Sequence, residues 1–150
     1  MKIRSARKQD IKALLQFEQE LVEFERPFDS TLKEGLISYY DILSRIESDD
    51  SCVLVAEVNG ELIGSGFIDI LESKSYLKHK YYGKLGFFFV KEKQRGKGVN
   101  KSILNELIKW SGKRGVFEIR LDVYYENLDA KSAYLNYGFE PNLLEMRLKI

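Results

Sequence analysis

A short glycine-containing segment, Gln94–Asn100, has the composition of an anion-binding turn, with glycines at positions 96 and 98. It follows the apolar run Leu85–Val90 and leads into a helical pattern that begins at Val99. Glycine lets the backbone approach a ligand closely, and the N–H groups at the start of a helix carry about half a positive charge. The segment therefore predicts a site for a phosphate or a pyrophosphate.

Positive charge is concentrated around this turn. The whole chain carries 24 Lys and Arg against 23 Asp and Glu, a net charge of +1, so its average surface favours neither nucleic acid nor anionic lipid. Between residues 74 and 101, Glu92 is the sole acidic residue. The basic residues there are Lys74, Lys78, Lys80, Lys84, Lys91, Lys93, Arg95, Lys97 and Lys101. The alternative is that Gly96 and Gly98 only permit a tight turn and the basic residues form a solvated face.

Other phosphate-binding motifs do not fit the spacing. A dinucleotide fingerprint requires a third glycine where Lys101 stands, and a Walker-type loop requires Ser or Thr where Gly98 follows Lys97. Nucleotide hydrolysis is therefore disfavoured. DNA or RNA binding would depend steeply on salt. It is also disfavoured, because the basic residues surround a glycine turn and do not lie on a base-reading helix.

The composition fits one soluble globular domain over residues 1–150, with 44% hydrophobic residues. The N-terminus has no apolar signal core, and every apolar run is shorter than the roughly 18 residues that span a membrane. We therefore expect a cytoplasmic protein with no membrane contact. Cys52 is the one cysteine and precedes an apolar run, which predicts a small buried side chain. We expect no metal site.

The hydrophobic pattern of the first half predicts the elements that precede the turn. Alternating runs predict strands, and apolar residues at intervals of three and four predict helices. The expected elements are a strand at Ile3–Ala6, a helix that opens at Asp10 and runs through Phe24, a helix from Leu32 to Ile46, and strands at Cys52–Val58 and Leu62–Leu71. Asn59 and Gly60 separate the last two strands, which predicts a tight antiparallel hairpin.

The second half predicts the elements on either side of the turn. They are a strand at Tyr81–Val90, a helix from Val99 that stops at Gly112–Gly115, a strand at Glu118–Tyr124, a helix at Leu128–Tyr137 and a closing strand at Leu143–Lys149. Gly83 and Gly86 within the first of these predict a bulge or a close ligand approach. Strand, helix and strand in sequence imply a parallel crossover, so we expect an α/β (α+β) fold with a mixed, mostly antiparallel central sheet and flanking helices.

Two blocks of sequence resemble the GCN5-related N-acetyltransferases. The order of the expected elements is also that of the family, so the resemblance covers essentially the whole chain. The first block of that family is Gln or Arg, two residues, Gly, one residue, then Gly or Ala, and here Arg95 and Gly98 match while Asn100 replaces the small residue. The second block is matched in order and spacing by Asn127, Ala130, Tyr134, Gly138 and Phe139.

The resemblance implies that acetyl-coenzyme A (acetyl-CoA) binds between a splayed parallel pair of strands, one ending at Val90 and the other at 118–124. The pantetheine arm would lie beside Phe88–Val90, the N–H groups of Arg95–Lys101 would hold the pyrophosphate, and an N–H near Phe89 or Val90 would polarise the thioester carbonyl. Tyr134 would act as the acid for the departing thiolate. The implied cofactor-binding residues are Phe88, Phe89, Val90, Arg95, Gly96, Lys97, Gly98, Val99, Asn100, Lys101, Asn127, Ala130 and Tyr134.

The implied reaction transfers the acetyl group directly to a primary amine of a small molecule or peptide. Such an amine is protonated at neutral pH, so a base or a water relay must accept its proton. The family's carboxylate is absent from Tyr81–Val90. The remaining candidates for the base are Asp69, Glu72, Asp122, Glu126 and His79. Phe28, Glu72 and Asp122 are the expected substrate contacts. An acidic, aromatic rim that includes Glu18, Glu20, Glu23 and Glu25 would favour a cationic acceptor.

A second hypothesis is an acyl-CoA-binding domain without turnover, used as a sensor. The missing carboxylate favours it, whereas Tyr134 favours an enzyme. A homodimer is a further expectation, because relatives are frequently dimers.

Overall fold

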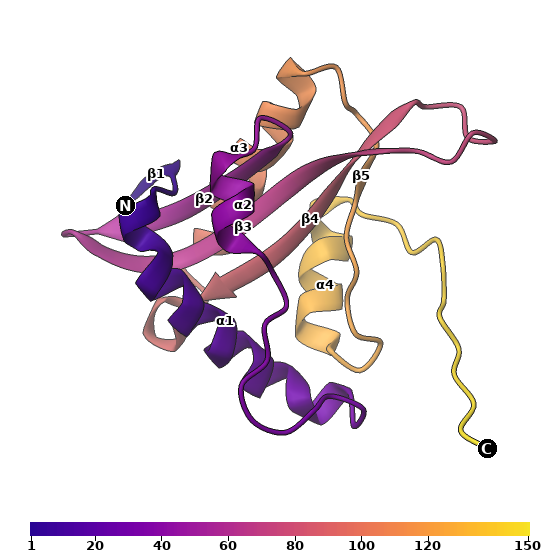
Figure 1. Cartoon of the computed structure of the whole chain (residues 1–150), viewed down its shortest axis with the longest axis horizontal. Helices are drawn as coiled ribbons and strands as arrows, with labels where there is room; N and C mark the ends of the chain where they lie inside the picture. Colours follow the sequence, from indigo (N-terminus) through magenta and orange to yellow (C-terminus); the bar gives the residue numbers. More distant parts are fainter.

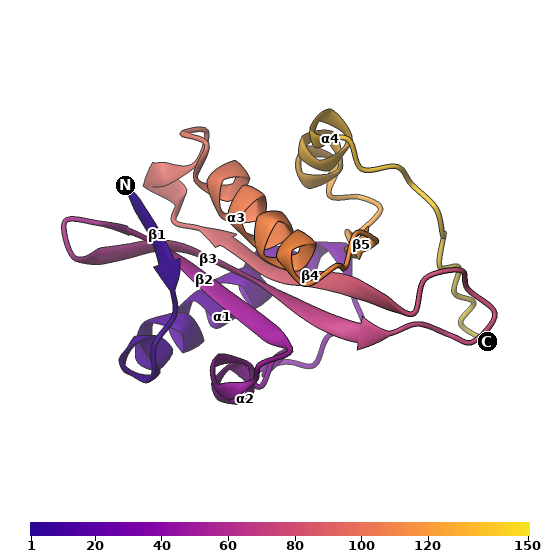
Figure 2. The ribbon, with the colours of Figure 1, turned by 90° about the horizontal axis from the view of Figure 1, so that it is seen from above.

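The computed structural model describes residues 1–150 as a central sheet between two helical layers (Figures 1 and 2). The five strands lie in the order β1-β2-β3-β4-β5. They are β1 (Lys2–Ser5), β2 (Ser51–Val58), β3 (Glu61–Glu72), β4 (Tyr81–Val90) and β5 (Ile119–Arg120). The α-helices are α1 (Ile11–Glu25), α2 (Ile42–Glu47), α3 (Val99–Lys113) and α4 (Leu128–Tyr137). None of these helices has the length and apolar character needed to cross a membrane.

The sheet is antiparallel from β1 to β4 and parallel between β4 and β5, which confirms the mixed sheet. The β2–β3 hairpin turns at Asn59 and Gly60, whose φ angles are 51° and 80°. Two successive positive φ angles are what a type I′ turn requires, and Asn and Gly tolerate them best. This turn fixes the register of β2 against β3.

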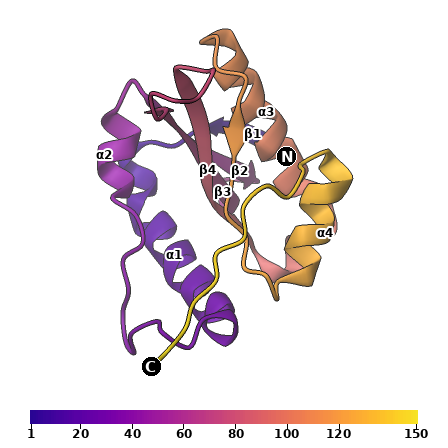
Figure 3. The same ribbon diagram turned by 90° about the vertical axis from the view of Figure 1, so that its right-hand side faces the viewer.

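The core forms two layers, one on each face of the sheet. Helices α1 and α2 cover one face, and α3 and α4 lie on the other (Figure 3). The first layer contains Leu14, Phe17 and Leu21 of α1 with Val55, Phe67, Phe87 and Phe89 of the sheet. The second contains Val99, Ile103, Leu104 and Leu107 of α3 with Leu54, Ile68 and Leu85. A sheet buried on both faces explains why β4 is apolar nearly throughout.

A bulge near the end of β4 confirms the irregularity that its glycines predicted. Ser65 pairs with Phe89 and Phe67 with Gly86, so β4 has one residue more than β3 between these pairs. Phe87 takes a φ of 57°, which is rare for a bulky residue. A Cβ on Gly86 would lie 2.6 Å from the Phe67 ring, so this position excludes any larger residue. Because bulges bend strands, the end of β4 turns away from its parallel neighbour.

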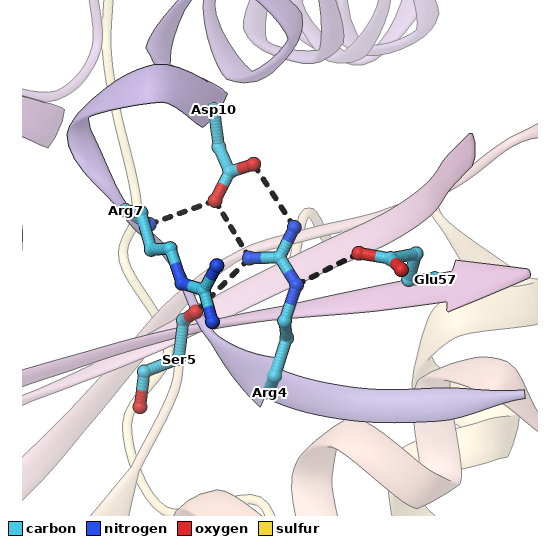
Figure 4. Close-up of polar contacts among 5 residues, drawn as sticks. All are labelled: Arg4, Ser5, Arg7, Asp10 and Glu57. Atoms are coloured by element: carbon cyan, nitrogen blue, oxygen red, sulfur yellow. Dashed lines mark hydrogen bonds and ion pairs between the residues drawn. The ribbon is translucent and has the colours of Figure 1, made fainter. Parts of the chain in front are cut away.

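A polar cluster joins β1 to the start of α1 (Figure 4). The guanidinium of Arg4 donates to both carboxylate oxygens of Asp10, at 2.7 and 3.0 Å, and to Glu57 at 2.8 Å. The backbone N–H of Arg7 also donates to Asp10, at 2.7 Å. Hydrogen bonding from Arg4 lowers the pKa of Asp10, although its burial opposes this. The cluster fixes the N-terminus of the helix that faces the end of β4.

Three predicted elements differ from the structure. Two of them are shorter than predicted, and the third does not form. The helix expected from Leu32 to Ile46 is reduced to Ile42–Glu47. Gly35 has a φ of 79°, and the N–H groups of Tyr39 and Tyr40 donate to the Glu18 side chain instead of to helical carbonyls. The strand expected at 118–124 is confined to Ile119–Arg120, because β4 bends away beyond Lys84.

The third correction concerns the closing strand expected at Leu143–Lys149. Residues 139–150 form no strand and pair with no part of the sheet. The alternating apolar side chains that predicted the strand are exposed, including Leu143, Met146 and Leu148. Arg147 anchors the segment by donating to Asp29 and Thr31, at 3.2 and 3.0 Å. Periodicity alone did not reveal that this segment stays unpaired, although β5 ends the sheet with one edge unoccupied.

Candidate functional site

The loop between β4 and α3 presents six successive backbone N–H groups, of residues 96–101, that donate to no other group of the protein. Gly96 and Gly98 turn the chain with φ angles of 74° and 77°, and Gly98 is the N-cap of α3. The N–H of Arg95 donates to the Glu92 carbonyl at 3.1 Å, so the series begins one residue later than predicted. Unbonded amides at a helix N-terminus suit an anion.

Several lysines near this loop carry charge that no carboxylate neutralises. Lys93, Lys97 and Lys101 are exposed, and the Lys97 ammonium donates only to the side-chain oxygen of Gln94, at 3.1 Å. Lys84 and Lys91, in contrast, form ion pairs with Asp122 and Glu61, each at 2.6 Å. The unneutralised charge therefore lies beside the free amides.

The two parallel strands separate on the way to this loop. Only Gly83 and Lys84 of β4 pair with β5. The N–H of Lys91 donates to the Ile63 carbonyl of β3 at 2.9 Å. Because N–H groups alternate along a strand, the N–H and carbonyl of Val90 face the opposite, unpaired side. An amide-rich chain such as pantetheine could pair with this edge in the way a further strand would.

Tyr134, the predicted acid, lies on α4 against the end of β4. Its ring centroid lies 6.3 Å from that of Phe88 and 5.8 Å from that of Phe139, with both pairs edge to face. Burial raises the pKa of Tyr134 to about 12, and the side chain of Asn100 opposes this rise. The Asn100 side-chain oxygen is buried without a hydrogen-bond partner. The hydroxyl of Tyr134 is therefore protonated at neutral pH and lies near the first turn of α3.

Helix α4 is held at both ends, and this fixes Tyr134 in place. Asn127 caps the N-terminus by accepting from the N–H of Ala130 at 3.2 Å, and Gly138 ends the helix with a φ of 115°. The hydroxyl of Tyr137 donates to the Asn105 side chain of α3 at 2.7 Å. The residues of the second block therefore have a structural function in α4. A contact between Asn127 or Ala130 and a cofactor stays a prediction.

Two of the predicted bases lie away from Tyr134 and are already paired. Asp69 accepts from Arg45 and Ser51, at 3.0 and 2.7 Å, within the β2–β3 pair. The His79 ring lies 3.0 Å from an amino group of Arg120. The structure therefore brings neither group together with Tyr134.

The other predicted carboxylates are exposed. Glu72 pairs with Tyr81, nine residues from Val90, or about 30 Å along the strand. The side chain of Asp122 is 88% exposed and pairs with Lys84. Glu126 is exposed in the turn before α4, where its backbone carbonyl accepts from Leu128 at 2.9 Å and its carboxylate faces solvent. Of the expected substrate contacts, the structure therefore separates Glu72 and Asp122 from Tyr134.

Phe28, the third expected substrate contact, belongs to an aromatic group near the end of α1. Its ring stacks on that of Tyr124, with centroids 6.0 Å apart, and meets Phe24 edge to face at 5.7 Å. Sequence reasoning missed Tyr39, which joins this group from the irregular segment after α1. Tyr39 lies there because Glu18 accepts from its N–H at 2.8 Å, a tertiary contact that a helical pattern does not reveal.

Comparisons with known proteins agree with this arrangement. The model of the acetyltransferase (GNAT) family matches residues 13–139. The uncharacterized N-acetyltransferase YhfO of Bacillus subtilis is 29% identical over 140 residues, which cover 93% of this chain and 90% of that protein.

Solved structures share the fold over nearly the full length. A mutant of the BH1408 protein from Bacillus halodurans superposes with a TM-score of 0.88 at 20% identity, covering 100% of this chain and 99% of the other. A predicted acetyltransferase from Clostridium acetobutylicum, solved with acetyl-CoA, gives 0.76 at 18% identity, covering 99% and 95%. The chain belongs to the acetyltransferase (GNAT) family and is an acetyl-CoA-dependent acetyltransferase.

Proposed function

We propose that the protein transfers the acetyl group of acetyl-CoA directly to a primary amine of a small molecule or peptide, within a ternary complex. The observation that carries this proposal is the series of six unbonded N–H groups at residues 96–101, next to the unpaired edge of β4 and to Tyr134. These groups match the anionic, amide and thioester parts of acetyl-CoA in that order along the site.

The pyrophosphate binds the N–H groups of Gly96–Lys101, and the exposed lysines meet the remaining phosphate. The pantetheine arm lies along Phe88–Val90, with Asn127 and Ala130 on its other side. The free N–H of Val90 donates to the thioester carbonyl as negative charge develops on its oxygen. Removing one such donor from other enzymes costs roughly 2.7 to 4 kcal/mol.

Tyr134 supplies the proton that the departing thiolate requires. Its pKa of about 12 keeps the hydroxyl protonated at neutral pH, and its position against Phe88 puts it beside the predicted path of the pantetheine arm. A protonated donor held by packed rings loses little orientation entropy on reaction.

A thiol-release assay with a panel of alkyl, aryl and peptide amines tests the proposal. At least one amine class should yield CoA thiol together with acetylated amine. With that amine, the Tyr134→Phe variant should lose activity about 100-fold and still bind acetyl-CoA with a dissociation constant within threefold of that of the unmodified protein. Saturable acetyl-CoA binding without thiol release for any amine would contradict transfer to an amine.

A further inference from the structure

Glu25 is the one glutamate of α1 whose carboxylate accepts no hydrogen bond from an N–H group. Glu18 accepts from the backbone of Tyr39 and Tyr40, Glu20 from Gln16 at 3.1 Å, and Glu23 from Arg26 at 2.8 Å. Glu25 is half-buried at the last residue of the helix, pairs with no cation, and has the hydroxyl of Tyr39 as its polar neighbour. Partly buried charges are usually paired, so this carboxylate is unusual.

Arg26, which follows Glu25 in sequence, and Arg147, which binds the nearby Asp29, are both engaged elsewhere. Arg26 donates to Glu23 and to the carbonyls of Lys33 and Gly35, both at 2.6 Å. The guanidinium of Arg147 is taken by Asp29, whose carboxylate also accepts from Thr31. Neither arginine neutralises Glu25. The adjacent Asp29 is already satisfied, which makes it a poor site for a further cation.

Tyrosines surround Glu25 from three separate parts of the chain. They are Tyr39 and Tyr40 before α2, Tyr124 after β5, and Tyr134 on α4. The negative charge of Glu25 raises the pKa of all four, in each case as a smaller effect than burial. The carboxylate therefore lies within electrostatic reach of the proposed acid. Their helices, α1 and α4, lie on opposite sides of the sheet (Figure 3).

The hydroxyl of Tyr39 is the second unsatisfied group at this place. It is buried and makes no hydrogen bond of 3.5 Å or less. Burial raises the pKa of Glu25, and the nearby Tyr39 hydroxyl opposes the rise. A buried hydroxyl and a half-buried carboxylate that lie close together with no cation between them are satisfied together by one cationic donor.

We propose that Glu25 binds the ammonium group of the acceptor and accepts its proton, with Tyr39 and Tyr124 lining the same site. This role rests on the proposed function. A primary ammonium has three donors, which fits a carboxylate and a tyrosine hydroxyl, and aromatic rings attract cations at close range. The acceptor is therefore a primary alkylammonium compound, and its amine enters from the α1 side toward Tyr134.

The protons balance over the reaction. Glu25 takes one proton from the ammonium, and the neutral amine forms a C–N bond with the thioester carbon. When the C–S bond breaks, Tyr134 donates a proton to the sulfur, and its phenolate recovers one from the amide nitrogen. Glu25 then releases its proton to water. The net products are the acetylated amine, CoA thiol and one proton.

Glu25→Gln tests this role, with Glu106→Gln, an exposed glutamate of α3 outside the site, as the control. With an amine that the unmodified protein accepts, kcat/KM for that amine at pH 7 should fall about 100-fold or more in Glu25→Gln. It should stay within twofold in Glu106→Gln. Acetyl-CoA affinity, measured by calorimetry, should be unchanged in both variants, which separates this role from general damage to the site.

The dependence of kcat/KM on pH distinguishes a base from a residue with only a structural role. The groups that face Glu25 are tyrosines, which stay neutral through pH 9. With Glu25 as base, kcat/KM should be nearly level between pH 7 and 9. In Glu25→Gln it should rise about tenfold per pH unit, because only the neutral amine then reacts. Tyr39→Phe, which keeps the ring, should raise KM for the amine severalfold and leave kcat within twofold.

The outcomes are distinguishable. An unmodified protein that binds acetyl-CoA but acetylates no amine overturns the proposed function and this role with it. An active protein whose Glu25→Gln variant keeps its rate and a level pH profile overturns the role of Glu25 alone. Should Glu25→Gln fail to fold, an unchanged KM in Tyr39→Phe would likewise overturn the site.

Discussion

The side chain of Arg95 folds back onto the end of β4, where its Nε donates to the carbonyl oxygen of Val90 at 3.1 Å. The guanidinium carbon also lies 5.2 Å from the centroid of the Phe24 ring on α1. Arg95 thus ties the start of the anion-binding loop to both the strand and the helix. Its side chain acts on the shape of the loop, while the following residues provide the free N–H groups.

Arg95→Met should weaken acetyl-CoA binding about tenfold, because the loop loses this tie and the Val90 carbonyl loses its donor. Stability should change by about 0.5 kcal/mol or less, since the side chain is exposed. Lys113→Met removes the same charge from an exposed residue at the opposite end of α3 and should change the affinity less than twofold. Calorimetric dissociation constants that rise equally in both variants would show that only charge matters.

Gly98 and Gly112 form a contrasting pair on α3. An alanine at Gly98 must adopt a φ of 77°, at a cost of about 1 to 2 kcal/mol, and acetyl-CoA affinity should fall at least tenfold. An alanine at Gly112 meets Phe117 at an ordinary 3.8 Å and should stabilise the helix by up to about 1 kcal/mol without changing affinity. Denaturant unfolding and calorimetry check both. If both alanine substitutions changed the free energy of unfolding in the same direction, this explanation would be wrong.

Asn100 departs from the small residue of the family and leaves a buried side-chain oxygen without a donor. Asn100→Ala removes this orphan acceptor and improves helix propensity, so the free energy of unfolding should rise by about 1 kcal/mol. The pKa of Tyr134 should rise further, because Asn100 lowers it. Denaturant unfolding and ultraviolet titration measure the two effects. A loss of stability would mean that Asn100 has a partner in solution.

The Arg4–Asp10 pair should make stability depend on pH in the acid range. The pKa of Asp10 is lowered in the folded protein, so the ionised carboxylate stabilises the fold above its ordinary pKa of 3.8, and this contribution is lost as the pH falls below that value. Asp10→Asn should reduce the free energy of unfolding by about 3 kcal/mol at pH 7. The difference in free energy of unfolding between the unmodified protein and Asp10→Asn should become smaller as the pH falls below 5, as measured by urea titration. A difference independent of pH would contradict an ionised Asp10.

Local signals predicted the fold wherever neighbouring residues decide the structure. Asn59–Gly60 determined the hairpin, Gly83 and Gly86 indicated the bulge, and the Gly96–Gly98 turn was expected before α3. These features depend on backbone conformations that few residue types adopt, so the residue types at these positions are enough to predict them.

Tertiary contacts decided what the sequence could not predict. Glu18 and Glu25 lie seven residues apart on one face of α1, and only the structure shows that the backbone N–H groups of Tyr39 and Tyr40 satisfy the first while no N–H group reaches the second. The exposed segment after Phe139 has the alternation of a strand, yet it pairs with no strand of the sheet. The base remained unassigned for the same reason, since its partners come from distant parts of the chain.

The most direct test of the central claim is a pair of calorimetric titrations, one with acetyl-CoA and one with acetyl-pantetheine, which lacks the pyrophosphate. If the N–H groups of Gly96–Lys101 hold that pyrophosphate, acetyl-CoA saturates a single site and acetyl-pantetheine binds at least about 100-fold more weakly, a difference of about 2.8 kcal/mol. Equal affinities for the two compounds, or no saturable heat with acetyl-CoA, would contradict the account.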